Sequence, residues 1–279
     1  CNWREERRDA MRAAAKLDLP FTTFDLSSAY QKSVIDYLVN EYRAGRTPNP
    51  DVMCNQQIKF GAFFDEARRR GAALIATGHY AKIRRDDNFP APGRRGEVAT
   101  KLSSRLLTSR DRDKDQTYFL WPSKQEILAK CLFPIGDYQK SAVRKLAKKF
   151  GLLNADKPDS QGLCFLGQID FKDFLAKQLP KKIGSVLNEK GEVIGEHRGA
   201  HLYTIGERHG FNVKRKTSSE TAYYIVAKDM VKNTIAVAPR AQFDSWVVKE
   251  ITLSDTNWFA DGLDDEANLQ ARTRYRAPL

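Results

Sequence analysis

The sequence predicts a parallel α/β domain followed by a small β domain and a partial β-barrel. Helical and strand patterns alternate over the first half of the 279 residues, as they do in βαβ units. From about residue 183 the pattern changes to short strands separated by turn residues. We therefore place domain boundaries near residues 168 and 240, which gives domains at 1–168, 169–240 and 241–279.

Four elements are predicted before the first buried strand. They are a helix at 4–17, a short strand at 21–26 (FTTFDL), a helix at 28–44 and a helix at 60–70. Val34, Leu38 and Tyr42 recur at four-residue spacing in the second helix, the period of one helical face. Gly71 follows the last helix, where glycine commonly ends one.

The stretch ALIATGHY, residues 73–80, predicts a strand of the parallel sheet. Its continuous apolar run from Ala73 to Ala76 is typical of a strand buried on both faces. TGHY then falls at the carboxyl end of the strand, the edge of a parallel sheet where ligands bind. Residues 84–105 are rich in Arg, Asp, Pro and Gly, so we expect an exposed loop or hairpin there.

KSAVRKLAKKFG, residues 140–151, predicts an amphipathic helix that ends at Gly151. Its basic side chains either contact a phosphate backbone or form an ordinary solvated face, and the sequence leaves both open. The second half predicts strands in five stretches: a hairpin in SVLNEKGEVIGEH with its turn at Lys190 and Gly191, HLYTI, TAYYIVAKD paired with NTIAVAP, WVVKEITL, and LQARTRYR.

The composition is that of a folded protein with a strongly basic surface. Lys and Arg number 47 against 35 Asp and Glu, a formal charge of +12. Such an excess favours an anionic partner, such as nucleic acid or an anionic membrane surface, although a solvated basic surface is the plainer alternative. The sequence contains no apolar run long enough to predict a transmembrane helix.

The chain has four cysteines, whose spacing argues against a secreted disulfide framework and gives little support to a zinc site. Cys131 lies among apolar neighbours, which predicts a buried, unreactive thiol. Cys54 and Cys164 lie in segments dense with turn and polar residues, where we expect thiols near solvent. From these residues alone, a working pair and two unrelated half-buried cysteines are equally supported.

Several motifs taken together indicate a protein family that the chain resembles. In order and spacing, GRTPNPDVMCNQQIKF, ATGHYAKI, DKDQTYFLW, LFPIGDYQKSAVRKLA, KPDSQGLCFLG, LYTIGERHGF and TRYR resemble the tRNA-specific 2-thiouridylases (the MnmA/TrmU family) over nearly the whole chain. The resemblance implies an ATP-pyrophosphatase domain of the PP-loop, adenine nucleotide alpha hydrolase-like class. It also implies an enzyme that uses ATP, together with Mg²⁺, to put sulfur on C2 of the wobble uridine of tRNA.

The resemblance also implies roles for individual residues. Cys164 would receive sulfur as a persulfide, and Cys54 would act as nucleophile and close a transient disulfide with Cys164. Asp51 would serve as general acid or base, a task that suits a carboxylate of raised pKa; its local alternative is an Asx-turn after Pro50. The other implied contacts are Asn49, Pro50 and Asp51 with the target base, Gly78 with ATP, and His79, Lys114, Asp115, Gln116, Arg274 and Tyr275 with tRNA.

The sequence also departs from the family pattern. The chain begins at Cys1 within a helix pattern and stops within a strand-like alternation, so we expect both ends of a longer protein to be missing. The phosphate-binding SGGxDS loop does not occur in these residues, so we expect this piece alone to bind ATP poorly. Glu207 stands where relatives commonly carry Gln. A non-catalytic tRNA-binding protein and a thiol-redox protein remain the alternatives. For the enzyme, we expect a sulfur-relay protein or cysteine desulfurase as donor, no membrane association, and a cytoplasmic location, with a mitochondrial one left open.

Overall fold

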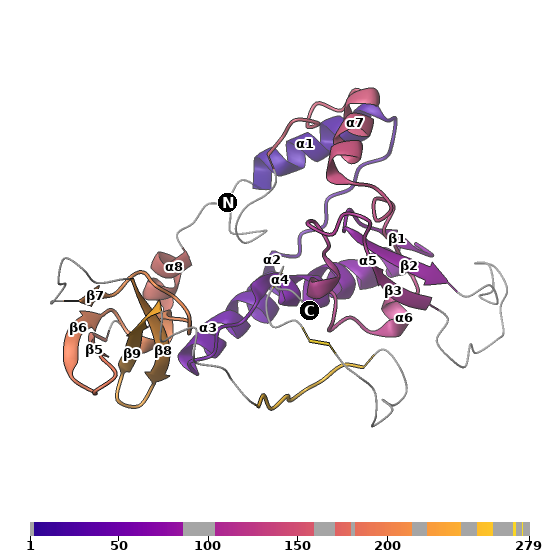
Figure 1. The fold of residues 1–279 in the computed structure, drawn as a ribbon. Helices are drawn as coiled ribbons and strands as arrows, with labels where there is room; N and C mark the ends of the chain where they lie inside the picture. The colour runs from indigo at the N-terminus through magenta and orange to yellow at the C-terminus, as the bar shows by residue number, and fades with distance from the viewer. Residues whose placement is uncertain are drawn as a thin grey trace. The chain divides into compact units, whose positions relative to one another are not determined.

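The structure, a computed structural model, describes most of the chain as two compact units (Figure 1). The first comprises Cys1–Tyr30, Asp51–Gly167 and Asp255–Leu279, and the second comprises Gln31–Pro50 and Gln168–Ser254. The described residues are 3–85, 104–158, 171–179, 182–213, 222–240, 250–258, 270–271 and 275. None of the helices in these ranges has the length and apolar character needed to cross a membrane.

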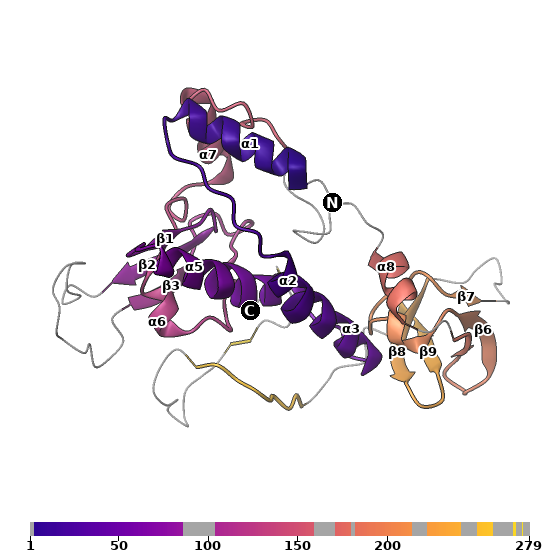
Figure 2. The same cartoon turned by 180° about the vertical axis from the view of Figure 1, so that it is seen from behind.

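The first unit is built from helices and two small sheets. Its helices are α1 (Trp3–Lys16), α2 (Ser27–Tyr30), α4 (Pro50–Met53, which begins at the unit boundary), the π-helical η2 (Cys54–Ala62), α5 (Phe63–Arg69), the 3₁₀ turn η3 (Thr117–Phe119), α6 (Gln125–Leu128) and α7 (Lys140–Lys149). Helices α1 and α7 lie side by side in both views (Figure 1 and Figure 2). Lys157, just beyond α7, supports this pairing by binding Glu6 at 2.9 Å and Asp9 at 2.7 Å on α1.

The strands of the first unit confirm a parallel α/β pairing. β1 (Ile75–Ala76) pairs with β4 (Cys131–Leu132) in parallel, with Ile75 opposite Cys131. β2 (Ala81–Arg85) and β3 (Ser104–Thr108) pair in antiparallel register, as the predicted hairpin requires. The connection between them, residues 86–103, lies outside the described residues.

A single apolar cluster joins these helices and strands. Phe60 on η2 is 1% exposed and Leu120, directly after η3, is fully buried. The cluster consists of Phe60, Phe64, Ala67, Ile75, Ala81, Leu120, Leu128, Cys131 and Phe133. Because it contains residues from η2, β1, β2, β4 and the segment after η3, it fixes the ends of these elements relative to one another.

Two expectations for this unit are wrong. FTTFDL is not a strand: Phe24 packs its ring against Phe63, with centroids 5.5 Å apart, and the Arg70 guanidinium lies 4.5 Å from its centre. Its aromatic character serves side-chain packing rather than a backbone ladder. The strand in ALIATGHY is also not buried on both faces, because buried Ile75 alternates with exposed Ala76, the pattern of a strand with one covered face.

The second unit packs helices on a five-stranded sheet. Its elements are the π-helical η1 (Gln31–Ile35), α3 (Asp36–Arg43), α8 (Phe171–Gln178), β5 (Gly184–Leu187), β6 (Val193–His197), the 3₁₀ turn η4 (Ala200–Leu202), β7 (Asn212–Val213), β8 (Tyr223–Asp229) and β9 (Thr234–Pro239). The strand order is β7-β6-β5-β9-β8. The β5 and β9 pair is parallel and the other pairs are antiparallel.

Both predicted strand pairs of this unit are confirmed. β5 and β6 meet through a turn with Gly191 at φ 78°, and β8 pairs with β9. The predicted strand HLYTI is wrong, because Ala200 to Leu202 form a 3₁₀ turn. Asn233 stabilises that turn by accepting the backbone N–H of Ala200 through its side-chain oxygen at 3.0 Å. The predicted strand WVVKEITL is wrong over residues 250–253, which form no strand, and its other half lies outside the described residues. LQARTRYR lies largely outside them as well.

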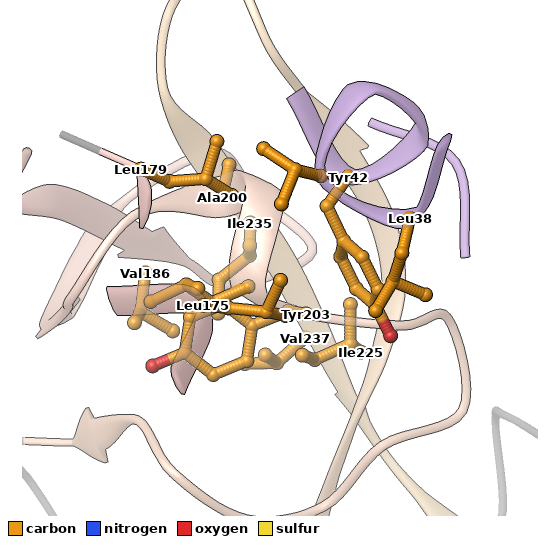
Figure 3. Close-up of a cluster of buried hydrophobic side chains, with 12 residues drawn as sticks. Leu38, Tyr42, Leu175, Leu179, Val186, Ala200, Tyr203, Ile225, Ile235 and Val237 are labelled. Carbon is orange, nitrogen blue, oxygen red and sulfur yellow. The ribbon is translucent and has the colours of Figure 1, made fainter. Parts of the chain in front are cut away.

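The core of the second unit sits between its helices and its sheet. In Figure 3, Leu38 and Tyr42 of α3 point toward Ile225 and Tyr203, while Leu175 lies near Val186. The buried members of the cluster are Leu38, Val39, Tyr42, Leu175, Leu179, Val186, Ala200, Leu202, Tyr203, Ile225, Ile235 and Val237. A helix that precedes the first unit's sheet in sequence therefore completes the second unit's core.

Candidate functional site

The NPD motif forms the start of a helix. Asn49 occupies the position before α4, where asparagine is a favoured cap, and Pro50 is the first helical residue, where its missing N–H costs nothing. α4 runs directly into η2, so Asp51 and Cys54 are three residues apart on continuous helix and share a face. This arrangement places a carboxylate and a thiol on the same side of one helical turn.

Cys54 is buried, which corrects the expectation of a thiol near solvent. Its exposed fraction is 2%, whereas Asp51 is only partly buried. The turn residues that suggested an exposed loop instead begin the helix, and the helix directs Cys54 inward together with Asn55 and Ile58. Short π-helical segments such as η2 are often found at functional sites.

The two residues after Cys54 bind this helix to the segment around η3. Asn55 is 3% exposed and donates its side-chain N–H to the carbonyl of Phe119 at 3.3 Å. Gln56 donates in the same way to the carbonyl of Pro122 at 3.4 Å. The first turn of η2 is therefore held by two side-chain amides.

His79 lies at the end of β1 and contacts the same turn. Its Nε2 is 3.2 Å from Oδ1 of Asn55, and its Nδ1 is 2.8 Å from Oγ1 of Thr77. The ring packs against Phe60 and Phe133, with centroid distances of 5.6 and 5.8 Å. Burial, helped by the nearby positive charge of Lys59, lowers the pKa of His79 to about 3, so the imidazole is neutral at physiological pH.

The KDQ segment is built into the same region of the first unit. Asp115 is 4% exposed, and its carboxylate accepts the backbone N–H of Ser109 at 2.8 Å and the hydroxyl of Thr117 at 2.6 Å. Gln116 accepts the backbone N–H of Tyr80 through Oε1 at 2.9 Å and donates its own N–H to the Tyr80 carbonyl at 2.8 Å. The NPDxxCN, TGHY and KDQ motifs thus converge through hydrogen bonds.

Gly78 lies exposed between Thr77 and His79. A Cβ placed on it would meet no atom within 4 Å. The backbone at the end of β1 is therefore open to close approach by a ligand. Cys164 and Arg274 lie outside the described residues, so their predicted roles stay predictions.

Aromatic residues that sequence reasoning missed surround Tyr275. Its ring centroid lies 4.7 Å from that of Phe119 and 6.1 Å from that of Tyr118. Separately, Asn257 donates its side-chain N–H to the carbonyl of Trp121, two residues after Phe119, at 2.6 Å. The only signal in the sequence was the TYFLW run that follows the KDQ motif. Sequence reasoning also assigned no role to Asn55 or Thr77. Asn55 directly follows the predicted site residue Cys54, and Thr77 directly precedes Gly78.

The structure also describes Cys131, the basic face of α7 and Glu207, for which expectations came from the sequence. Cys131 is fully buried, which confirms the predicted burial, and burial raises the pKa of its thiol to about 12. On α7, Arg144 donates to the carbonyls of Ala155 and Lys157, each at 3.1 Å, so part of the basic face serves the fold. Glu207 accepts the backbone N–H of Thr204 at 3.1 Å, a bond that the carbonyl oxygen of a Gln side chain can also accept.

Comparison with known proteins defines the class. Residues 1–168 match the family model described as the tRNA methyl transferase HUP domain, and residues 172–239 match the tRNA methyl transferase PRC-barrel domain. The HUP match covers more than half of the chain. The fold is therefore that of a HUP domain joined to a PRC-barrel domain.

The similar curated proteins give a narrower family. The chain is 40% identical over 281 residues to the tRNA-specific 2-thiouridylase MnmA of Streptococcus agalactiae serotype III (strain NEM316), covering 100% of this chain and 72% of that protein. It is 41% identical over 278 residues to the protein of the same name from Bacillus velezensis, covering 99% and 70%. The Enterococcus faecalis protein is 38% identical over 277 residues, covering 99% and 71%. The chain belongs to the MnmA family of tRNA-specific 2-thiouridylases.

Proposed function

We propose that this chain carries the catalytic residues of a tRNA-uridine 2-sulfurtransferase, which activates the C2 oxygen of the wobble uridine with ATP and replaces it with persulfide sulfur. The observation that carries the proposal is the Asp51 and Cys54 pair on one helical turn, fixed by the side-chain amides of the buried Asn55 and the partly buried Gln56. The 2-thiouridylase names of the relatives at 38–41% identity support thiolation over the methyl transfer that the family model's description mentions.

The proposed reaction balances in three steps. The C2 oxygen attacks the α-phosphate of ATP and pyrophosphate leaves. The terminal sulfur of a Cys164 persulfide attacks C2 and AMP leaves with the oxygen. The Cys54 thiolate then attacks Sγ of Cys164, which releases 2-thiouridine and forms a Cys54 to Cys164 disulfide. In a variant of this route, Cys54 attacks the persulfide first and free sulfide attacks C2. Both routes need a dithiol reductant to restore the two cysteines.

In this proposal Asp51 handles the proton of the target base. It lies on the same helical face as Cys54 and is only partly buried, so it is within reach of a base that has left its stack. A base-modifying enzyme needs such extrusion because the reacting atom is otherwise inaccessible. Asn49 and Pro50 precede Asp51 directly and complete the proposed base contact.

The proposed nucleotide contact is Gly78, whose open backbone accommodates a close approach. In this scheme ATP, together with Mg²⁺, is a substrate. Oxide is a poor leaving group, so ATP first adenylates the C2 oxygen, which then leaves as part of AMP. The Gly78→Ala variant tests the contact cleanly, because the added methyl meets no protein atom and should leave folding intact. A weakened ATP affinity with an unchanged melting temperature supports the contact, and an unchanged affinity refutes it.

The proposed tRNA contacts combine charge and stacking. Lys114 supplies a cation beside the buried Asp115, and Tyr275 with Tyr118 and Phe119 supplies half-buried aromatic rings. Unstacked RNA bases bind to aromatic faces of this kind, and cations bind the backbone phosphates. His79 and Arg274 complete the set of proposed contacts, and a persulfide-bearing relay protein or cysteine desulfurase is the proposed sulfur donor.

The decisive assay uses the protein expressed from its complete reading frame, with unmodified tRNA, ATP and a persulfide donor. Cys54→Ser and Cys164→Ser should each abolish 2-thiouridine formation measured by nucleoside mass spectrometry. Cys131→Ser is the matched control, since Cys131 is buried in the apolar cluster and has no proposed role. Retained thiolation in both Cys54→Ser and Cys164→Ser would refute the mechanism.

The formal charge of +12 also fits one alternative, a tRNA-binding protein without catalysis. The same assay separates the two. Tight, salt-sensitive tRNA binding without thiolation in the wild-type protein supports the binding module. Thiolation that depends on ATP supports the enzyme.

A further inference from the structure

The chain leaves α3 in a fixed direction before it reaches the NPD motif. Gly45 follows the helix with φ 79°, and its N–H donates to the carbonyl of Tyr42 at 2.9 Å. The N–H of Arg46 donates to the carbonyl of Glu41, also at 2.9 Å, and the Arg46 guanidinium binds both carboxylate oxygens of Glu41 at 2.6 and 2.5 Å. This is the Schellman arrangement, in which a glycine in the left-handed conformation ends the helix. The exit of the chain from α3 is therefore set by hydrogen bonds.

The same segment then contacts two other parts of the second unit. A Cβ on Gly45 would lie 2.6 Å from Cγ of Met230, so the backbone packs directly on the turn between β8 and β9. Oγ1 of Thr47 lies 2.9 Å from Oγ1 of Thr204, which is 157 positions further along the chain. This hydroxyl pair lies only two residues before Asn49.

Thr204 is itself held firmly to the central sheet of the unit. Glu207 accepts the backbone N–H of Thr204 through its carboxylate and donates its own N–H to the Thr204 carbonyl, each at 3.1 Å. The same turn exchanges two backbone hydrogen bonds with Ile225 of β8. Gly206 donates to the Ile225 carbonyl at 2.7 Å, and Ile225 donates to the Glu207 carbonyl at 2.9 Å. Because Ile225 is fully buried, the Thr204 hydroxyl is presented from a fixed element.

The backbone between the hydroxyl pair and the NPD motif is stiff. Pro48 and Pro50 flank Asn49, and a proline ring fixes its own φ at about −65°. A proline also restricts the residue before it, here Thr47 and Asn49, to extended conformations. A shift of Thr47 is therefore transmitted to Asn49 and is not absorbed between them.

We propose that Thr204 is a positioning residue for the NPD motif, because its hydroxyl, through Thr47, fixes the place of Asn49 and Pro50. These two residues belong to the second unit, as Thr204 does. The inference rests on the proposed function in taking the NPD motif as the contact with the target base. It gives the second unit a part in the reaction, since that unit holds the first two residues of the base contact.

The test compares Thr204→Val with Thr204→Ser in the complete protein. Valine keeps the shape of threonine and removes the hydroxyl, whereas serine keeps the hydroxyl. The measurements are kcat for thiolation, Kd for tRNA, the melting temperature, and amide hydrogen exchange in the peptide that spans residues 44–53. Thr234→Val is the matched control, since it makes the same substitution in β9, where valine is a favoured strand residue.

We expect Thr204→Val to lower kcat by roughly 10-fold, because small misplacements of reacting groups are costly. Exchange in residues 44–53 should be several-fold faster, while exchange in β5 and β9, the melting temperature and Kd for tRNA stay as in wild type. Thr204→Ser and Thr234→Val should match wild type in every measurement.

Three results for Thr204→Val would overturn the proposal. The first is unchanged exchange in residues 44–53, which would show that the hydroxyl pair does not hold the segment. The second is faster exchange throughout the second unit, which would show general destabilisation in place of positioning. The third is an unchanged kcat in a protein that thiolates tRNA.

A double-mutant cycle assigns the effect to the hydroxyl pair. Thr47→Val removes the other partner of the bond, so it should reproduce the faster exchange and the lower kcat of Thr204→Val. The double variant should be no worse than either single variant, because the same interaction is already lost. Additive effects contradict the proposal. Hydrogen exchange needs no turnover, so a wild-type protein that does not thiolate tRNA refutes the proposed function, and the cycle measured by exchange still decides whether Thr204 holds the segment.

Discussion

At the scale of single residues, the neutral His79 makes the free energy of unfolding depend on pH. Burial lowers its pKa from 6.5 to about 3. Between these two pH values the unfolded chain therefore binds a proton at His79 and the folded chain does not. Its stabilising contribution is therefore complete above pH 6.5 and is lost as the pH falls toward 3.

This sign gives a measurable acid destabilisation. Between pH 7 and pH 5.5, His79 should lower the free energy of unfolding by about 1 kcal/mol. Urea unfolding of wild type and His79→Gln at the two pH values isolates the contribution, because the glutamine does not titrate. An identical pH dependence in both proteins would show that His79 is readily protonated in the folded state.

The cysteines provide a second prediction at this scale. Cys54 and Cys131 are 2% and 0% exposed, so a thiol reagent should modify both slowly in the native protein and rapidly in urea. Raising the pH from 7 to 9 should leave Cys131 unreactive, since burial raises its thiol pKa to about 12. Peptide mass spectrometry after timed alkylation measures each site. Native alkylation of Cys54 at the rate of a small free thiol would contradict its burial.

At the scale of elements, Gly136 is where the turn after β4 meets β2. A Cβ on Gly136 would lie 1.9 Å from the carbonyl oxygen of Ala81, and its own carbonyl accepts the Arg110 N–H at 2.8 Å. Gly136→Ala should therefore cost about 1–3 kcal/mol, as overpacking does. Gly71→Ala is no matched control, because Gly71 has φ 92°. Gly78→Ala is a matched control, and chemical denaturation should find its stability near that of wild type. Equal stability of Gly136→Ala and Gly78→Ala would contradict the close approach of Gly136 to the Ala81 carbonyl.

The elements also show what a sequence pattern can and cannot predict. The helix at 140–149 and the strand pair β8 and β9 follow from local periodicity, which the structure confirms. HLYTI has the alternation of a strand, but the distant Asn233 stabilises a 3₁₀ turn there. Local propensity cannot include a partner that arrives from elsewhere in the chain.

The candidate site divides in the same way. The NPDxxCN, TGHY and KDQ motifs are recognisable in the sequence, and the structure brings them together. The burial of Cys54 and the hydrogen bonds of His79 with Thr77 and Asn55 were not predictable, because turn-forming residues indicate a loop and a helix start equally well. Which one forms depends on the packing of Phe60 and Ile58 beneath the helix.

At the scale of the whole molecule, the chain order and the structural units do not coincide. Residues 31–50 belong to the second unit, although they precede the sheet of the first. Leu38 and Tyr42 of α3 lie in the core with Val186 and Ile225 (Figure 3). The division into domains at 168 and 240 stays a prediction, and the PRC-barrel match at 172–239 leaves α3 out although α3 packs in that unit's core.

This discontinuity predicts where damage to α3 appears. Leu38→Ala removes a fully buried side chain from the second unit, and Leu128→Ala removes one that is 1% exposed from the first; each should cost about 2–5 kcal/mol. Amide hydrogen exchange should become faster in β5 and β9 for Leu38→Ala, and in β2 and β3 for Leu128→Ala. Exchange reports local cooperative units. Faster exchange in β2 and β3 for Leu38→Ala, with β9 still protected, would therefore show that α3 stabilises the first unit and contradict its assignment to the second.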